Sequence, residues 1–328
     1  MSDESRRVML TGVASNVGRA LATELLAAGH EVFGIDRRSW DDAPEGLQFE
    51  KVDLRKRGAE DFVRRVRPQT IVHLATVTHL FEKSEERYRI NLAGTRAVFD
   101  YASEQGVEHV VFVGRHTYYG AGADAPFFHK EDEPPAQVGH FPELADLVAS
   151  DLYASTALWR LPNVAVSLLR VCYTLGPSGR GTLAAFLRAR TSEKNRSRAT
   201  EQHGYWDDVV PLVMGYDPLF QFVHEADLVQ ALLRCVETRP RGVFNVAGPP
   251  PLPLSVIARE AGRRPMPIPE PLLRAMLGRF GLPRLSAGAL EHIKYPITID
   301  DSAFRAATGY EPAWGAPETL AEFRARFP

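Results

Sequence analysis

Cysteine is scarce in this sequence, with only Cys172 and Cys235 among 328 residues. Two cysteines are too few for the disulfide framework of a secreted protein, which favours a reducing, cytoplasmic location. Long hydrophobic runs are also missing, because no segment approaches the roughly 20 apolar residues of a membrane span. The polar start, Met1 to Arg7, leaves no room for the apolar stretch of a signal peptide. The sequence therefore predicts neither export nor membrane insertion.

An excess of charge of one sign is missing as well. Lysine plus arginine number 39 and aspartate plus glutamate number 41, so the formal net charge is −2. A nucleic-acid-binding protein normally carries a strongly basic balance, so nucleic acid is not expected as a partner. No metal site is predicted. Hydrophobic residues make up 45% and charged residues 24%, which is typical of a compact globular chain.

The sequence does contain a regular alternation of short aliphatic runs with longer helical stretches, from about residue 7 to residue 170. Such alternation is typical of β-α-β units that build a parallel sheet. We expect strands at residues 8–10, 31–35, 47–52, 70–73, 109–113 and 165–169, and helices at 16–28, 85–105 and 143–160. The predicted fold class is therefore α/β, with a doubly wound parallel (Rossmann) sheet covered on both faces.

The regular alternation ends near residue 176. Residues 191–208 are polar and turn-rich, and residues 249–271 carry eight prolines around one short expected helix at 254–263. Between them a strand at 220–223, a helix at 225–237 and a strand at 243–246 are expected to return to the main sheet. We predict a main domain of residues 1–176 and 219–249, and a smaller, discontinuous C-terminal lobe of residues 177–218 and 250–328 that binds substrate.

The segment from Thr11 to Gly18 follows the first expected strand and opens the first helix. A tight turn there lets backbone N–H groups and the helix N-terminus meet a pyrophosphate, and glycine permits the close approach. Ser15 stands where the usual pattern has a central glycine, and we expect it to weaken binding rather than abolish it. The contact residues expected from this loop are Gly12, Ser15, Asn16, Val17 and Gly18.

The next expected strand leads into Asp36, eighteen residues after Gly18. A carboxylate at this place can accept hydrogen bonds from both hydroxyls of an adenine ribose. Arg37 and Arg38 follow and could accommodate a 2′-phosphate, but Asp36 would repel that phosphate. The glycine-containing loop and Asp36 together predict a dinucleotide site that prefers NAD to NADP. Arg37 is assigned to this site as well.

By these motifs the chain resembles the extended short-chain dehydrogenase/reductase family, and within it the NAD-dependent nucleotide-sugar epimerases and dehydratases. The resemblance covers nearly the whole chain. It also rests on Val52-Asp53-Leu54, His73-Leu74-Ala75, Asn91 to Thr95, Tyr119-Gly120, Leu169-Arg170, Leu175-Gly176-Pro177, Phe222 to Asp227 and Gly242 to Val246.

The resemblance implies NAD as the cofactor and a homodimer through the helices at 85–105 and 143–160. It implies adenine contacts from Asp53 and Leu54 and a structural role for Asn91. The other residues assigned to the cofactor are Leu74, Ala75, Thr76 and Val113. We interpret His73 and Cys172 as core residues, because both stand in apolar, strand-like runs.

The family's hydride chemistry needs a tyrosine whose phenol is made acidic by a lysine four residues later. None of the six lysines in this sequence has a tyrosine four positions before it. Aligned through Asp151, the tyrosine position is held by Glu143 and the lysine position by Leu147, or, with the register shifted by one, by Leu144 and Val148. A free tyrosine acting as the base near neutral pH would cost roughly 4 kcal/mol, about a thousandfold in rate. The usual chemistry is therefore not expected.

Polar replacements nonetheless gather where the catalytic groups should stand. Arg115 falls on the position of the catalytic serine, and His116 and Thr117 follow it. Together with Glu143 these are the predicted catalytic residues, because they could converge on one pocket wall. Two classes of function stay open. One is an enzyme with His116 or Glu143 as the proton-transfer group, and the other is a non-catalytic NAD-binding ligand or redox sensor.

The expected ligand is a small molecule that is anionic or nucleotide-linked. The guanidinium of Arg115 suits a carboxylate or phosphate, although Arg115 could instead pair with Glu131 or Asp132. A basic run from Arg188 to Arg198 could bind a sugar diphosphate or could be a solvated surface. The residues assigned to the substrate are Thr76, Thr117, Tyr173 and Arg196.

Overall fold

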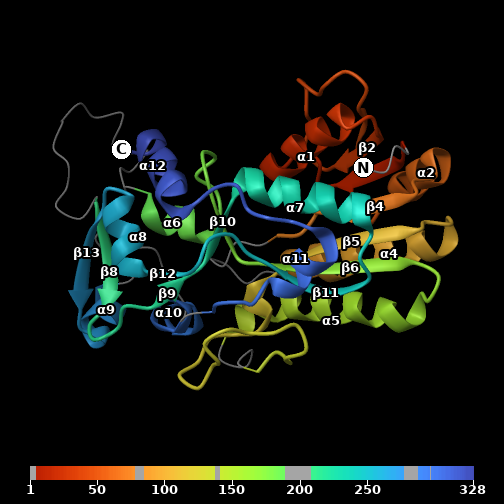
Figure 1. Cartoon of the computed structure of the whole chain (residues 1–328). Coiled ribbons are helices and arrows are strands. Elements are labelled where there is room, and N and C mark those ends of the chain that lie inside the picture. Colours follow the sequence, from red (N-terminus) through yellow and green to blue (C-terminus); the bar gives the residue numbers. More distant parts are fainter. Residues whose placement is uncertain (1–4, 78–84, 137–140, 189–207, 277–286, 296) are drawn as a thin grey trace.

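A parallel sheet of seven strands forms the centre of the larger part of the molecule (Figure 1). The computed structural model describes residues 5–77, 85–136, 141–188, 208–276, 287–295 and 297–328. The strand order is β11-β6-β5-β4-β1-β2-β3. The strands are β1 (Arg7–Thr11), β2 (Glu31–Asp36), β3 (Gln48–Lys51), β4 (Thr70–His73), β5 (His109–Arg115), β6 (Ala165–Val171) and β11 (Gly242–Val246). The order reverses at β1, which confirms the predicted doubly wound fold.

Each face of the sheet is covered by helices and has its own hydrophobic core. On one face lie α1 (Asn16–Ala27), α7 (Glu225–Thr238) and α11 (Ser302–Thr308), and on the other lie α2 (Arg57–Val66), α4 (Gly94–Glu104) and α5 (Ala145–Arg160). Successive residues of a strand point to opposite faces. In β1, accordingly, Val8 and Leu10 join the first core and Met9 joins the second.

The helix predicted at residues 85–105 is interrupted. It consists of α3 (Glu85–Tyr88), a wide π-type turn at Arg89–Ala93, and α4. The turn carries Asn91, which is completely buried. A turn of this kind often marks a functional site because it re-aims a side chain. The helix predicted at 143–160 also differs, since its first turn is a short 3₁₀ turn at Pro142–Leu144.

The smaller lobe is built from short strand pairs and helices. Strand β8 (Val209–Val213) pairs with β13 (Arg264–Ile268), and β9 (Leu219–Phe220) pairs with β12 (Leu252–Pro253). The helices described in this lobe are α6 (Thr182–Leu187), α8 (Leu254–Glu260), α9 (Glu270–Met276), α10 (Ala287–Lys294) and α12 (Ala316–Arg326). A separate core, which includes Leu183, Ile257 and Phe323, holds this lobe together.

Two expectations about irregular structure need correction. The proline-rich residues 249–271 contain α8 and β13, not a single short helix between turns. Strand β13 tolerates Pro265 and Pro267 because it pairs only with β8 and leaves its other edge unpaired. The polar residues 191–207 lie outside the described part of the chain, so their prediction is untested.

The strand predicted at 220–223 does not return to the main sheet. It is divided between β9 and β10 (Phe222–His224), and β10 pairs with β7 (Tyr173–Leu175). The division falls at Gln221, whose side-chain amide bonds both the N–H and the carbonyl of Ile299. The strand β11 does rejoin the main sheet, beside β6. The proposed domain boundaries stay a prediction.

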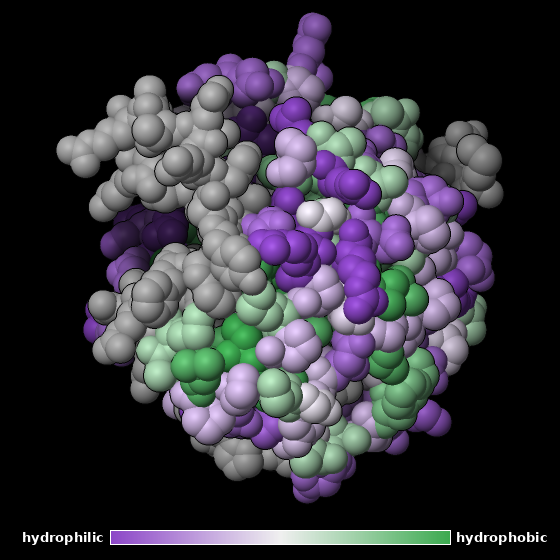
Figure 2. Space-filling model, turned by 90° about the vertical axis from the view of Figure 1, so that its left-hand side faces the viewer, coloured by the Kyte–Doolittle hydropathy of each residue, from purple (hydrophilic) through white to green (hydrophobic). Residues whose placement is uncertain are grey.

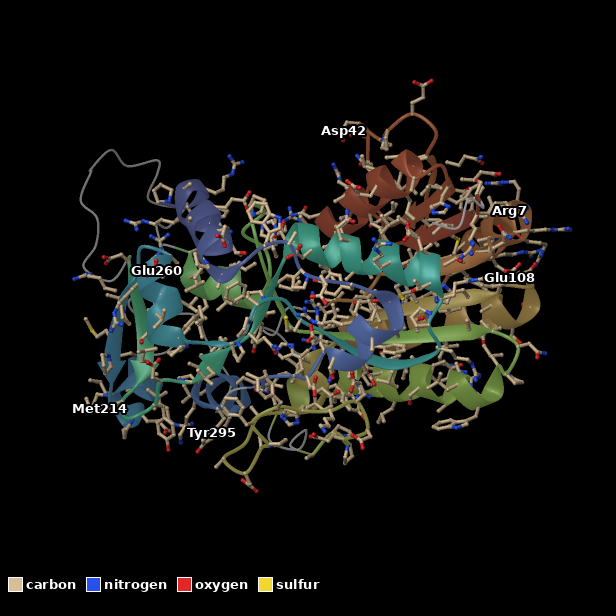
Figure 3. All side chains as sticks on the ribbon, viewed as in Figure 1. Arg7, Asp42, Glu108, Met214, Glu260 and Tyr295 are labelled. Atoms are coloured by element: carbon tan, nitrogen blue, oxygen red, sulfur yellow. The ribbon has the colours of Figure 1, made fainter. Side chains whose placement is uncertain are left out.

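The carboxyl ends of the main strands face the lobe. Arg7 and Glu108, at the amino ends of β1 and β5, lie at one end of the molecule, while Met214 and Glu260 of the lobe lie at the other (Figure 3). Seen from the lobe, the surface mixes hydrophilic residues with smaller hydrophobic patches (Figure 2). Among the described helices, none combines the length and the apolar character needed to cross a membrane.

Candidate functional site

A cavity of about 780 Å³ lies at the carboxyl ends of the main strands, between the sheet and the lobe. Open α/β sheets bind their ligands at this edge. Its wall is formed by Thr11, Gly12, Ser15, Ile35, Asp36, Arg37, Arg38, Val52, Asp53, Leu54, Arg55, Leu74, Ala75, Thr76, Val77, Ile90, Gly94, Arg115, His116, Thr117, Tyr173, Thr174, Gly179, Arg180, Gly181, Thr182, Ala185 and Arg188. Most of the predicted cofactor residues therefore meet in one place.

The glycine-rich loop is packed as closely as the sequence implies. Gly12 has a φ of +73°, and a Cβ there would lie 2.9 Å from the Cα of Ala75. A Cβ on Gly18 would lie 2.7 Å from the carbonyl oxygen of Gly12. Ser15 caps α1, since its Oγ accepts a hydrogen bond of 3.0 Å from the Gly18 N–H. This cap leaves the hydroxyl hydrogen of Ser15 available to a ligand.

Gly12 and Ser15 line the cavity, whereas Asn16 and Val17 line another part of the surface. Their side chains line a separate groove of about 340 Å³ between α1 and α7. Their backbone N–H groups belong to the first turn of α1, where no carbonyl of the same helix lies within reach. Any contact with a phosphate would therefore come from the backbone of these two residues.

Asp36 ties the end of β2 to the glycine-rich loop. Its Oδ2 accepts a 3.0 Å hydrogen bond from the Ala14 N–H, and its Oδ1 accepts a 2.9 Å bond from the Arg38 N–H. The Arg38 guanidinium also reaches this carboxylate, at 3.3 Å. Asp36 is 9% exposed and lies in the cavity wall. The carboxylate thus supports the loop and presents a negative charge to the cavity.

Asp53 lies further along the same wall with its carboxylate engaged. Arg55 donates two side-chain hydrogen bonds to it, of 3.0 and 2.7 Å. These bonds lower the pKa of Asp53 to about 2, so the group is ionised at neutral pH. Leu54 lies beside it in the cavity wall, buried at 7% exposure. Leu54 thus contributes an apolar side chain to this part of the wall, and Asp53 with Arg55 contributes a fixed ion pair.

Asn91 acts on the cavity through the segment that follows β4. Its Oδ1 accepts a 2.7 Å hydrogen bond from the Val77 N–H, and its Nδ2 donates to the Val77 carbonyl at 3.0 Å. Asn91 also donates to Asp146, which forms a buried ion pair with Arg87. The segment Leu74 to Val77 is therefore held in the cavity wall from behind. These contacts agree with the structural role expected of Asn91.

His73 and Cys172 are core residues, as the sequence predicts. The His73 ring is fully buried between the hydroxyls of Thr11 and Thr95, at 2.7 and 3.2 Å. Burial lowers its pKa to about 3. Cys172 is fully buried, and desolvation raises the pKa of its thiol well above the ordinary range. A thiol in that state is a poor nucleophile.

Arg115, His116 and Thr117 stand together at the end of β5, in the cavity wall. Burial, the main cause, and the nearby Arg115 charge together lower the pKa of His116 to about 3. The Nδ1–H of His116 donates to the Val171 carbonyl at 3.1 Å. The lone pair of this neutral ring is therefore on Nε2, which is buried and has no hydrogen-bond partner. Burial also lowers the pKa of Arg115.

Glu143 and Val113 lie beside the cavity rather than in its described wall. Glu143 precedes α5, its carbonyl accepts a hydrogen bond from Arg87, and its Oε2 is buried without a partner. Val113 lines a small neighbouring pocket together with Leu147 and Arg115. Leu147, which the sequence alignment puts at the lysine position, is thus an apolar side chain of this neighbouring pocket. The structure does not bring Glu143 together with His116 in the cavity wall.

A buried ion pair fixes the shape of the wall behind β5. Arg170 bonds Asp151 at 2.9 and 3.2 Å, and these two side chains are 3% and 2% exposed. The same guanidinium lies 3.5 Å from the ring centroid of Tyr118. Tyr119 donates to Asn245 at 2.8 Å. Both tyrosines that follow Thr117 therefore belong to the supporting structure, and burial raises the pKa of Tyr119 to about 12.

The lobe contributes residues that the sequence analysis did not assign to the site. Arg180 lies between Gly179 and Gly181, whose φ angles are +60° and +102°, and all three residues line the cavity. Arg188, the first residue of the predicted basic run, lines it as well. The short Gly-Arg-Gly sequence was the available signal. Tyr173, Thr76 and Thr117 lie in the wall as predicted, and Arg196 lies outside the described residues.

Comparison with protein families and solved structures shows which family the chain belongs to. A family model described as the NAD dependent epimerase/dehydratase family matches residues 8–247. The chain belongs to this family. NAD is the family's cofactor, which confirms the cofactor prediction and the predicted resemblance.

Similar proteins cover most of this chain at low identity. An uncharacterised protein of Mycobacterium tuberculosis is 26% identical over 285 residues, which are 84% of this chain and 70% of that protein. The UDP-glucose 4-epimerase of Thermus thermophilus, in complex with NAD, is 22% identical with a TM-score of 0.74, and the match covers 98% of both chains. The protein MoeE5, in complex with UDP-glucuronic acid and NAD, is 23% identical with a TM-score of 0.72 and covers 98% of both chains. At this identity the two solved structures show a shared fold.

Proposed function

We propose that this family member binds NAD and a nucleotide-linked ligand side by side in one cavity and acts on that ligand as an epimerase- or dehydratase-like enzyme with a non-standard site. One observation carries the proposal. One cavity of about 780 Å³ joins the carboxylate of Asp36 to the cations Arg180 and Arg188 of the lobe, and Arg115 and His116 also line it.

The residues at the Asp36 end fit the cofactor of the family. The loop at Gly12 leaves no room for a Cβ, which is the packing that lets a backbone approach a pyrophosphate closely. The first-turn N–H groups of α1 and the hydroxyl of Ser15 would meet the phosphates. Asp36 would accept hydrogen bonds from the adenine ribose. Leu54 and the segment Leu74 to Thr76 would line the remaining cofactor surface.

The residues at the lobe end fit a nucleotide diphosphate. Arg180 and Arg188 give this end two positive charges, which suits the phosphate groups of such a ligand. Thr174 and Thr182 place hydroxyl groups beside them. Tyr173 stacks on Phe220 at a centroid distance of 5.4 Å and forms part of the wall toward His116. The relatives named above that bind UDP-linked compounds support the same assignment.

The residues between the two ends would hold the reacting part of the ligand. Bound NAD supplies a hydride acceptor and donor in this family. His116 is neutral, its Nδ1–H donates to the Val171 carbonyl and its Nε2 is buried, so it would form part of the wall beside this part of the ligand. A pKa near 3 makes His116 a weak base, so proton removal at this site would be slow compared with a base whose pKa lies near 7.

A non-catalytic NAD-dependent sensor is the second candidate, and two observations favour it. The sequence has no tyrosine four positions before any lysine, and burial lowers the pKa of His116 to about 3. Both functions require the same binding events but differ in turnover.

The deciding experiment mixes the NAD-loaded protein with UDP-glucose and follows the absorbance of reduced nicotinamide together with the appearance of altered sugar. Transient reduction with a new sugar product supports the enzyme. Binding of the nucleotide sugar in calorimetry with no reduction and no product supports the sensor. No binding of any nucleotide sugar, while NAD binds, contradicts both.

A further inference from the structure

We infer that Phe327 is a positioning residue for the nucleotide diphosphate, because it holds Arg188 and the turn at Gly179–Gly181 in place beside the cavity. The inference rests on the proposed function and adds a residue that is not among the described residues of the cavity wall. Phe327 directly follows α12 and packs, partly buried, against the core of the lobe. Its role depends on its contacts with the turn, with Arg188 and with Arg263.

The ring of Phe327 lies directly against the backbone of Gly179. A Cβ placed on Gly179 would come within 2.2 Å of the Cζ of Phe327, so the ring fills the space that a side chain would need there. Gly179 also has a φ of +60°, which glycine adopts without strain. Arg180 is the next residue and lines the cavity. The ring therefore supports one side of the turn that carries this cation.

The same ring also contacts Arg188, the second cation of the lobe end. The guanidinium carbon of Arg188 lies over the ring of Phe327, 5.3 Å from its centroid, within the range of a cation–π contact. An exposed arginine side chain loses rotamer freedom when it binds a ligand, and that loss weakens binding. Holding the guanidinium on the ring beforehand reduces the loss. The contact uses the face of the guanidinium, so its in-plane N–H groups stay directed outward for phosphate oxygens.

Arg263 fixes the distance between the ring and the helix that carries Arg188. Its guanidinium, only 6% exposed, donates to the Leu187 carbonyl at 2.7 Å and to the Phe327 carbonyl. Leu187 ends α6 and directly precedes Arg188. Figure 1 accordingly shows α12 next to α6. One buried cation thus joins the backbone before Arg188 to the backbone of Phe327, and the two side chains meet in a fixed geometry.

The alternative is that Phe327 only fills the core of the lobe. Phe323, one turn earlier in α12, has that role, because it is completely buried in the lobe core. The two rings touch, with centroids 4.9 Å apart, but Phe327 directs its outer side toward Gly179 and Arg188. A ring that only fills the core would affect stability and both ligands alike. A positioning ring affects the diphosphate selectively.

The test titrates UDP into the full chain loaded with NAD, and NAD into the full chain, by calorimetry. Phe327→Leu keeps an apolar side chain over Gly179 but removes the aromatic face. We expect it to weaken UDP binding about three- to thirtyfold, the range of a cation–π contact, and to leave NAD affinity within about twofold. Arg188→Met should weaken UDP binding at least about tenfold, because a charge-assisted contact is lost. Adding Phe327→Leu to Arg188→Met should cost less than about twofold more, because the ring acts through that cation.

Phe127→Leu is the matched control. The side chain of Phe127 is 62% exposed and is not among the described residues of the cavity wall, so neither UDP nor NAD affinity should change. Denaturant unfolding of each variant confirms that the folded state is populated at the titration temperature. If Phe327→Leu does not fold, Phe327→Met takes its place under the same criteria.

The inference is overturned if Phe327→Leu binds UDP within about twofold of the unmodified protein, or if it weakens NAD and UDP by the same factor. It is also overturned if the losses of Phe327→Leu and Arg188→Met multiply in the double variant, since the two residues would then act independently. In these cases the proposed function survives, because the unmodified protein still binds UDP. If the unmodified protein binds neither UDP nor UDP-glucose, the proposed function fails together with the inference.

Discussion

Removing the carboxylate of Asp36 tests both roles that the structure gives it. In Asp36→Ala an adenine ribose would lose charge-assisted hydrogen bonds, so we expect NAD binding to weaken by about 1–3 kcal/mol, roughly 5- to 150-fold. The preference for NAD over NADP should shrink, because the charge that repels a 2′-phosphate is gone. The assay is calorimetric titration of each dinucleotide.

The same substitution should also lower stability. The Ala14 N–H, which donates to Asp36 at 3.0 Å, would be left without its partner near a buried position. An unsatisfied buried donor costs about 1–3 kcal/mol, which denaturant unfolding of the dinucleotide-free protein would measure. Asp36→Asn keeps one acceptor oxygen and should lie between the wild type and Asp36→Ala in both assays.

Asp42→Ala is the matched control. Its side chain is 84% exposed and pairs with Arg19 only at 3.4 Å, so neither affinity nor stability should change measurably. The reasoning is refuted if Asp36→Ala binds NAD within about twofold of the wild type, or if the unmodified protein binds NADP more tightly than NAD.

Four further outcomes follow from the same structure. Gly12→Ala should reduce NAD affinity at least about tenfold and lower stability by about 1–3 kcal/mol, since the new Cβ would lie 2.9 Å from Ala75 and the φ is +73°; unchanged calorimetry and unfolding would count against it. Arg170→Met leaves the Asp151 carboxylate buried without its partner and should lower the free energy of unfolding by about 3–5 kcal/mol, as measured by denaturant titration; a loss below about 1 kcal/mol is the contrary result. The free energy of unfolding should fall as the pH drops from about 6.5 toward 3, because His116 takes up its proton more readily in the unfolded chain. His116→Gln should reduce the pH dependence of this free energy by up to ~1.4 kcal/mol per pH unit. Identical pH dependence in the two proteins would disprove the burial argument. Turnover on a simple alcohol should stay below about 1 s⁻¹ in a coupled nicotinamide assay, because no phenol–ammonium pair is present in the sequence; faster turnover would show the chemistry to be misassigned.

Local patterns were enough to predict the sheet and the cofactor end of the cavity. The run from Thr11 to Gly18 and the aspartate that ends β2 lie close to each other along the chain, and each forms within one β-α-β unit. Strand β1 contains a continuous apolar run, as a strand buried on both faces of a parallel sheet requires. Such features depend on neighbours in sequence, so the sequence alone reveals them.

Long-range contacts account for what the sequence did not predict. Strand β10 pairs with the distant strand β7, and Gln221, where the predicted strand divides, bonds Ile299, which is 78 residues away. Placing Glu143 on one pocket wall with His116 relied on an alignment through Asp151, whereas Glu143 lies in the 3₁₀ turn before α5 and outside the described cavity wall. The orphaned Nε2 of His116 follows from a contact with Val171 that no local motif encodes.

A crystal structure of the full chain with NAD and UDP-glucose tests the central claim most directly. The account predicts the adenine ribose on Asp36, the diphosphate of the sugar nucleotide near Arg180 and Arg188, and the sugar near the carboxyl end of β5. Density for NAD at another place, such as the groove between α1 and α7, or a sugar nucleotide bound away from the end of β5, would contradict it.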